Sequence, residues 1–244
     1  MVGALTTAAA GMEAQQNWIN ALSNDIANVS TTGYKSLRVG FRDLVYQEPG
    51  RGGAEGTSTG AGAAAEVMGQ NFEEGALEQT ERPLDVALTT PGFIRVGTPG
   101  GGVALTRDGN LQVAPDGKLR TATGQELVPP VQIPKNVDPE KLQIAPDGTV
   151  SAGRRTFGRI SLVEVTNPSG LQADGENGYL PTAASGPVKA APKARLQQGA
   201  LEASNVDLAS VMTEMTSAQQ GYAMAGKAIT TQDEVLAIAN GLIR

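Results

Sequence analysis

One segment carries most of the spacing of a phosphate-binding loop. Gly221 to Ala228, GYAMAGKA, matches G-x-x-x-x-G-K up to its last position. A phosphate loop needs a Ser or Thr hydroxyl next, to hold Mg²⁺, and it must join a strand to a helix. Ala228 has no hydroxyl, and Tyr222, Ala225 and Ile229 continue an apolar helical repeat. We therefore interpret the segment as part of a helix with small residues at its contacts.

The sequence offers few candidate residues for acid–base catalysis or metal binding. The 244-residue chain contains no His and no Cys, which removes the commonest general base and the thiolate and imidazole metal ligands. The adjacent acidic pairs Glu73-Glu74 and Asp233-Glu234 stand without a second acidic motif at a useful spacing. The sequence therefore nominates no catalytic residue, no metal site and no cofactor, and we predict that the protein is not an enzyme.

Charge and hydropathy exclude further classes of function. The 25 acidic and 19 basic residues give a net charge of −6, which disfavours a nucleic-acid partner because phosphates are neutralised by basic surfaces. No apolar run approaches the roughly 20 residues of a membrane span, so no direct membrane insertion is expected. The first basic residue is Lys35, so we expect no cleaved secretory signal peptide.

The two ends of the chain carry the strongest helical periodicity. At each end, apolar residues recur every seven positions, and a second, largely apolar series follows three positions later. This is the repeat of a coiled-coil seam. We expect the two terminal helices to pack on each other or on copies of themselves. The residues predicted to form this assembly interface are Leu5, Met12, Ile19, Leu22, Ile26, Val29, Leu208, Val211, Met215, Tyr222, Ile229, Leu236 and Ile243.

The N-terminal helix is predicted to end in a polar string, SNDIANVSTTGYKS, at residues 23–36. Thr is a poor helix former and Gly a frequent helix terminator, so this run is expected to stop the helix and redirect the chain. Residues 48–65 have low complexity and are expected to form a flexible or extended connector. The residues predicted to form this helix-end joint are Asn24, Asn28, Thr31, Gly33 and Tyr34.

The middle of the chain has a different pattern. Short runs such as GFIRV (92–96) alternate with Asp-Gly dipeptides at 108–109, 116–117, 147–148 and 174–175, which favour tight hairpin turns. We therefore predict an α+β fold in which the N- and C-terminal α-helices form a coiled-coil-like layer and the central β-rich module is antiparallel and contains hairpins. The predicted segments are an N-terminal assembly helix (1–30), a connector (31–66, Gly-rich from about 48), the β-rich module (67–200) and a C-terminal assembly helix (201–244).

Both ends also resemble a known family. ALSNDIANVSTTGYKSLRVGFRDLVYQ (21–47) resembles the N-terminal signature of bacterial flagellar rod and hook proteins, in which a helix ends in Ala-Asn-x-x-Thr-x-Gly-Tyr/Phe-Lys. Residues 197–236 resemble the C-terminal signature, including Leu-Glu-x-Ser-Asn-Val-Asp at 201–207. Leu-Asp-Val-Ala at 84–87 and Thr-Arg-Asp-Gly at 106–109 resemble the central module of the family.

The resemblance implies a structural subunit of the flagellar rod that polymerises into a hollow, torque-transmitting drive shaft. It implies export by the flagellar type III apparatus without a cleaved signal peptide, and a location in the basal body (extracytoplasmic, and periplasmic in a two-membrane cell). The implied partners are copies of the chain, other rod and hook proteins, and the export apparatus. FRDLVYQ (41–47) is most similar to distal-rod members, whereas RPLDVAL (82–88) is also similar to a proximal-rod relative.

Two alternatives stay open at this point. The chain could be a proximal-rod or hook subunit of the same family. It could also be a self-contained monomeric binding module whose terminal helices form an intramolecular hairpin. The second alternative predicts a monomer with both ends protected from protease, whereas a rod subunit has ends that are mobile until it assembles.

Overall fold

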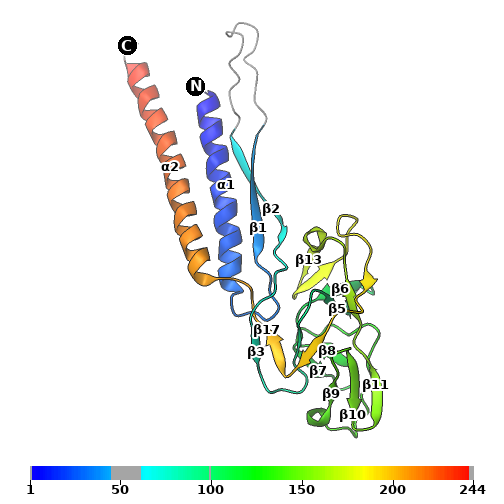
Figure 1. Cartoon of the computed structure of the whole chain (residues 1–244). Coiled ribbons are helices and arrows are strands. Elements are labelled where there is room, and N and C mark those ends of the chain that lie inside the picture. Colours follow the sequence, from blue (N-terminus) through cyan, green and yellow to red (C-terminus); the bar gives the residue numbers. More distant parts are fainter. Residues whose placement is uncertain (1, 45–61, 99, 242–244) are drawn as a thin grey trace. The chain divides into compact units, whose positions relative to one another are not determined.

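A computed structural model describes residues 2–44, 62–98 and 100–241, and they form two compact units (Figure 1). The first, which we call the helical unit, comprises Met1–Ala27, Leu37–Met68 and Asp207–Arg244. The second, the strand unit, comprises Asn28–Ser36 and Gly69–Val206. The chain therefore crosses from one unit to the other several times, and each unit is built from segments distant in sequence.

Two long helices dominate the helical unit. Helix α1 spans Val2–Ala27 and helix α2 spans Leu208–Gly241, and they pack side by side (Figure 1). Asp207 caps α2, because its side chain accepts a hydrogen bond of 3.1 Å from the Ala209 amide. Within the described ranges, neither helix is long and apolar enough to cross a membrane.

Small residues let the two helices approach closely. A Cβ added at Gly221 would lie 2.9 Å from Cδ of Gln15 on α1, and Ala218 is fully buried. Gly221 belongs to the segment that matches a phosphate-binding loop, and the structure places that segment within α2. Its glycines therefore lie within a helix, where Gly221 serves helix packing.

Two paired strands complete the helical unit beside α1. Strand β1 covers Leu37–Asp43 and strand β2 covers Ala63–Gln70. Trp18 of α1 meets Phe41 of β1 edge to face, with ring centroids 5.4 Å apart. The buried carboxylate of Asp25 accepts hydrogen bonds from the Leu37 amide at 3.0 and 3.3 Å, which fixes the start of β1 against the end of α1.

The strand unit contains three-stranded and six-stranded sheets and three strand pairs. The orders are β13-β14-β6-β5-β12-β15, β11-β10-β9, β16-β4, β17-β3 and β7-β8, and the recorded pairings are antiparallel. Two 3₁₀ turns, Pro139–Lys141 and Pro168–Gly170, interrupt the strands. The strands are β3 Leu77–Gln79, β4 Val86–Leu88, β5 Phe93–Gly97, β6 Val103–Thr106, β7 Leu111–Val113, β8 Leu119–Thr121, β9 Gln143–Ile144, β10 Thr149–Ala152, β11 Arg155–Arg159, β12 Leu162–Glu164, β13 Gln172–Gly175, β14 Gly178–Leu180, β15 Lys189–Ala190, β16 Leu196–Gln198 and β17 Ala200–Glu202.

Two apolar clusters form the core of the strand unit. The larger is aliphatic and includes Val96, Leu111 and Val150, all fully buried. The smaller contains Phe93 and Tyr179, whose rings meet Phe72 edge to face at centroid distances of 5.3 and 5.1 Å. Burial raises the pKa of the Tyr179 hydroxyl far above its ordinary value, so the phenol stays neutral.

The architecture confirms the α+β prediction, with packed terminal helices and an antiparallel β-rich centre. The Asp-Gly dipeptides at 116–117 and 147–148 lie in turns with positive φ at Gly117 and Gly148, whereas Asp174 and Gly175 are the last residues of β13 and the turn that follows is formed by Glu176 and Asn177. Gly109 is different, because it joins strands of separate sheets, and an added Cβ there would lie 1.6 Å from the Val86 carbonyl oxygen. The hairpin predicted at 108–109 is therefore wrong, and that glycine permits a close backbone approach instead.

Two segment bounds differ from the predicted ones. The segment 31–66, predicted as a connector, contains β1 and the first residues of β2, while its part at 45–61 lies outside the described residues. The segment 201–244, predicted as a helix, begins with two residues of β17, and its helix starts at Leu208. Leu201 and Glu202 are buried in the strand unit, so tertiary packing overrides their helical tendency there.

Candidate assembly interface and joint

Most of the predicted seam residues lie on α1 and α2, the two helices that pack against each other. Leu22 and Val211 are buried, whereas Leu208 and Tyr222 are 42% and 37% exposed. Val29 lies in the strand unit, beyond the end of α1. The Leu236 side chain and Ile243 lie outside the described residues. The remaining seam residues, Leu5, Met12, Ile19, Ile26, Met215 and Ile229, are half-buried.

Helix α2 also has a second apolar face that the heptad pattern did not include. Met224, Val235 and Ile238 are 68%, 51% and 65% exposed. Intervals of eleven and three residues place them on one side of the helix at 3.6 residues per turn, away from buried Val211 and Ala218. We call these three residues the outer stripe. Their spacing is visible in the sequence, but the stronger seven-residue repeat obscured it.

The joint after α1 is a compact turn within the strand unit. The Thr31 amide donates to the Asn28 carbonyl oxygen at 3.0 Å, and the Thr31 hydroxyl donates to Asn28 Oδ1 at 3.1 Å. Tyr34 is buried, and its amide donates to the Thr31 carbonyl oxygen at 3.3 Å. Asn24, the remaining predicted joint residue, is an exposed residue of α1. The structure therefore brings together Asn28, Thr31 and Tyr34 but leaves Asn24 in the helical unit.

Gly33 lies directly against other segments of the strand unit. Its amide donates to the Glu202 carbonyl oxygen at 2.7 Å. Its φ is +69°, and an added Cβ would lie 2.9 Å from backbone atoms of Arg107 and Asp108. The joint therefore needs glycine at this position for both its backbone conformation and its closeness to another segment.

A buried ion cluster lies next to this crossing, and sequence reasoning missed it. Glu202 Oε1 accepts from Lys35 Nζ at 2.5 Å, from Arg107 Nη1 at 2.9 Å and from the Gly75 amide at 3.0 Å. Lys35 Nζ also donates to the Glu73 carbonyl oxygen at 2.6 Å. The Lys35 and Glu202 side chains are 0% and 1% exposed. Burial lowers the pKa of Lys35, and the Glu202 carboxylate opposes that shift.

Asn205 adds a second link at the same end of β17. Its Oδ1 accepts from the Ser36 amide at 2.8 Å, and its Nδ2 donates to the Asn71 carbonyl oxygen at 2.8 Å. Asn177 Nδ2 similarly donates to the Thr32 carbonyl oxygen at 2.9 Å. These bonds and the ion cluster hold the segments where the chain enters and leaves the strand unit. The site is thus a structural clasp, which fixes the direction of two chain segments.

The buried carboxyl group of Asp108 leads to a prediction about how the stability of the protein depends on pH. It is buried, accepts from the Thr32 hydroxyl at 3.1 Å and the Asn110 amide at 3.0 Å, and burial raises its pKa. Above the raised folded-state pKa, the ionised buried carboxylate lowers stability relative to the unfolded chain. This cost decreases as the pH falls through that value and is lost completely only below the unfolded-state pKa. Asp108→Asn keeps an acceptor oxygen, so we expect it to be more stable than the parent at pH 7.

The measurement is thermal unfolding of parent and Asp108→Asn from pH 7 down to pH 3. The stability advantage of the variant should shrink as the pH falls, because the parent carboxyl becomes neutral. Asp116→Asn is the control with the opposite sign. Asp116 is exposed, and the hydrogen bond from the Lys118 amide lowers its pKa. A pH-independent difference for Asp108→Asn would contradict the prediction.

Comparison with known proteins shows the family. The C-terminal domain of flagellar basal body rod FlgEFG proteins matches residues 197–242, the D1 domain of flagellar hook proteins FlgE/F/G matches 87–152, and flagella basal body rod proteins match 5–35. The flagellar basal-body rod protein FlgG of Borreliella burgdorferi is 36% identical over 100% of both chains. The chain belongs to the flagellar basal-body rod protein family.

Other members of the rod protein family give the same result. FlgG of Caulobacter vibrioides is 36% identical over 96% of both chains, and FlgG of Bacillus subtilis is 34% identical over 97% of both. The resemblance seen in the terminal signatures is thereby confirmed, and so is the rod within the flagellar basal body as the setting of the family. Lys35, Arg107 and Glu202 each fall in a different one of the three matched regions. The ion cluster therefore joins all three regions of a rod protein.

Proposed function

We propose that this chain is a structural, non-enzymatic subunit of the flagellar rod that polymerises into a hollow, torque-transmitting shaft, in its distal part. The observation that carries this proposal is the pair of apolar faces on α2. One face packs on α1, and the outer stripe stays exposed in the single chain. Several large apolar side chains exposed on one side of a helix make that side a candidate for contact with another chain. A subunit of an open helical assembly needs such a face to contact its neighbours.

The proposed partners are copies of this chain, other rod and hook proteins, and the flagellar type III export apparatus. The proposed location is extracytoplasmic, in the periplasm of a two-membrane cell, reached without a cleaved signal peptide. Full-length similarity to rod proteins supports these assignments. The predicted seam residues contribute by keeping α1 and α2 paired, and the outer stripe contributes the contact between copies.

The first test introduces charge into the outer stripe. Met224→Glu/Ile238→Glu should abolish incorporation into rods and motility, because two carboxylates cannot be desolvated at an apolar contact. Both side chains are exposed in the single chain, so the free energy of unfolding should change by less than about 0.5 kcal/mol. The measurements are swimming in soft agar, the amount of the chain in isolated basal bodies, and thermal unfolding of the purified chain.

Gln219→Glu is the matched control, because Gln219 is an exposed residue of α2 outside the outer stripe. It should leave motility intact. A motile strain carrying only the double variant would contradict the proposed contact and favour a self-contained module whose helices pair within one chain. Crosslinking of the assembled chain to hook proteins or to proteins of the rod base would separate the distal, proximal and hook roles.

A further inference from the structure

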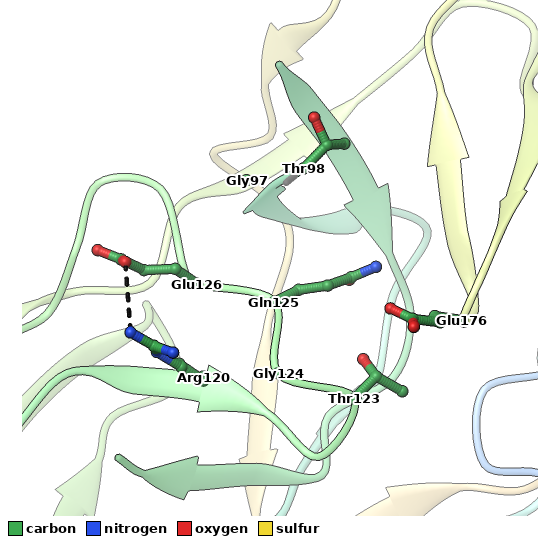
Figure 2. A pocket seen from close by; sticks show the side chains of 8 residues that line it. All are labelled: Gly97, Thr98, Arg120, Thr123, Gly124, Gln125, Glu126 and Glu176. Carbon is green, nitrogen blue, oxygen red and sulfur yellow. Dashed lines mark ion pairs between the residues drawn. The ribbon is translucent and has the colours of Figure 1, made fainter. Parts of the chain in front are cut away.

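The strand unit has a polar hollow of about 380 Å³ on its surface (Figure 2). It lies between the end of β5, the turn after β8 and the turn between β13 and β14. None of the structural features assigned above to the joint or to the α2 contact uses it. Its lining residues are Gly97, Thr98, Arg120, Thr123, Gly124, Gln125, Glu126 and Glu176.

The rim of the hollow carries uncompensated negative charge. Glu126 is paired with Lys118 at 2.7 Å and lies 4.0 Å from Arg120 (Figure 2). Glu176, at the tip of the β13–β14 turn, and Asp174, in β13, are both exposed. Neither has an ion-pair partner in the part of the chain that the structure describes. Of these two carboxylates, that of Glu176 lines the hollow and is open to a cation from outside, and Asp174 adds a second negative charge two residues away in the chain.

A buried amide inside the hollow also lacks a partner. Gln125 is about nine-tenths buried, and its Oε1 has no hydrogen-bond partner among the described residues. Figure 2 shows its side chain extending toward the space between Thr98 and Glu176. The exposed Glu176 carboxylate lines the same space, so a ligand for this hollow should be cationic.

The same unit presents a group of this kind elsewhere. Ala152 pairs with Arg155 across the β10–β11 hairpin, so Gly153 and Arg154 form its two-residue turn. Arg154 and Arg155 are exposed, and neither has an ion-pair partner among the described residues. A guanidinium combines a permanent positive charge with five N–H donors. We call Arg154 and Arg155 the arginine tip.

We propose that the arginine tip of one copy docks into the acidic hollow of a neighbouring copy. The inference rests on the proposed function, in which copies of the chain assemble. Because each copy carries a net charge of −6, copies repel one another at a distance, and a contact between them gains most where a basic group meets an acidic one. Each copy presents both surfaces on one unit, which is the arrangement that a head-to-tail contact requires.

The test is a charge exchange in a strain that carries only the variant chain. R154E/R155E reverses the tip, D174R/E176R reverses Glu176 of the hollow and its neighbour Asp174, and a third variant combines all four changes. Each reversal alone should lower the amount of the chain in isolated basal bodies at least tenfold, because like charges then face each other. The combined variant should recover to within about threefold of the parent, because the complementary pair is restored in the opposite sense.

K135E/K141E is the matched control, because it reverses two other exposed cations of the same unit. It should leave incorporation unchanged. A combined variant no better than the weaker single reversal would overturn the docking contact, as would single reversals without effect. In both cases, finding the parent chain in isolated basal bodies would still support the proposed rod function. Absence of the parent chain from basal bodies would instead contradict the rod function itself.

Discussion

Replacing Lys35 with Met is expected to lower the free energy of unfolding of the strand unit by about 3–5 kcal/mol. Glu202 Oε1 would lose its 2.5 Å partner, and Glu202 Oε2 is already buried without a hydrogen-bond partner among the described residues. Arg107 would remain at 2.9 Å. The remaining Arg107–Glu202 pair is balanced in charge, so the loss comes from hydrogen bonds: Lys35 Nζ donates to Glu202 Oε1 and to the Glu73 carbonyl oxygen, and its removal leaves both acceptors short of a donor.

Lys118→Met is the matched control within the same unit. Glu126 also has two cationic partners, Lys118 at 2.7 Å and Arg120 at 4.0 Å, but these side chains are about one-third exposed. Water screens such a pair, so this change should cost no more than about 1 kcal/mol. Hydrogen exchange of the β5 and β6 amides reports on the strand unit alone. Equal losses for the two variants would contradict the importance of burial in the ion cluster.

The terminal helices could be predicted because their signal is local. The seven-residue repeats locate α1 and α2 to within a few residues, apart from the start of α2, where Leu201 and Glu202 join a strand instead. Strand β5 lies within one residue of the run GFIRV for the same reason. Strand β1 was missed because its order depends on tertiary contacts, such as that of Phe41 with Trp18, which no local pattern records.

The clasp could not be predicted, because its partners are distant in sequence. Lys35 and Glu202 are 167 positions apart. In the sequence, each of them looks like an ordinary charged side chain on the surface. Both residues lie inside the sequence signatures that identify the family. A signature gives the residue types at each position but not which of them contact each other in the fold. Gly33 was predicted as a joint residue because glycine often terminates a helix. Its close approach to the backbone of Arg107 becomes visible only in the structure.

Gly33→Ala tests the close approach of residue 33 to the backbone of Arg107, and we expect it to destabilise the strand unit by about 3 kcal/mol. An alanine at φ +69° costs about 1–2 kcal/mol in backbone strain. The added Cβ, 2.9 Å from the Arg107 carbonyl and the Asp108 amide nitrogen, adds about 1–3 kcal/mol because backbone atoms must shift. The lower chain entropy of unfolded alanine offsets up to about 1 kcal/mol of this loss.

Gly199→Ala separates the cost of backbone strain from the cost of the close contact. Gly199 has a φ of +75° in the same unit, but an added Cβ there would meet no atom within 4 Å. It should therefore show the backbone strain alone, and be about 2 kcal/mol less destabilising than Gly33→Ala. Urea unfolding of both variants, followed by hydrogen exchange of strand-unit amides, measures the difference. If the two losses were equal, the joint would need glycine only for its conformation, and the close approach of Gly33 to Arg107 would contribute nothing to the stability of the strand unit.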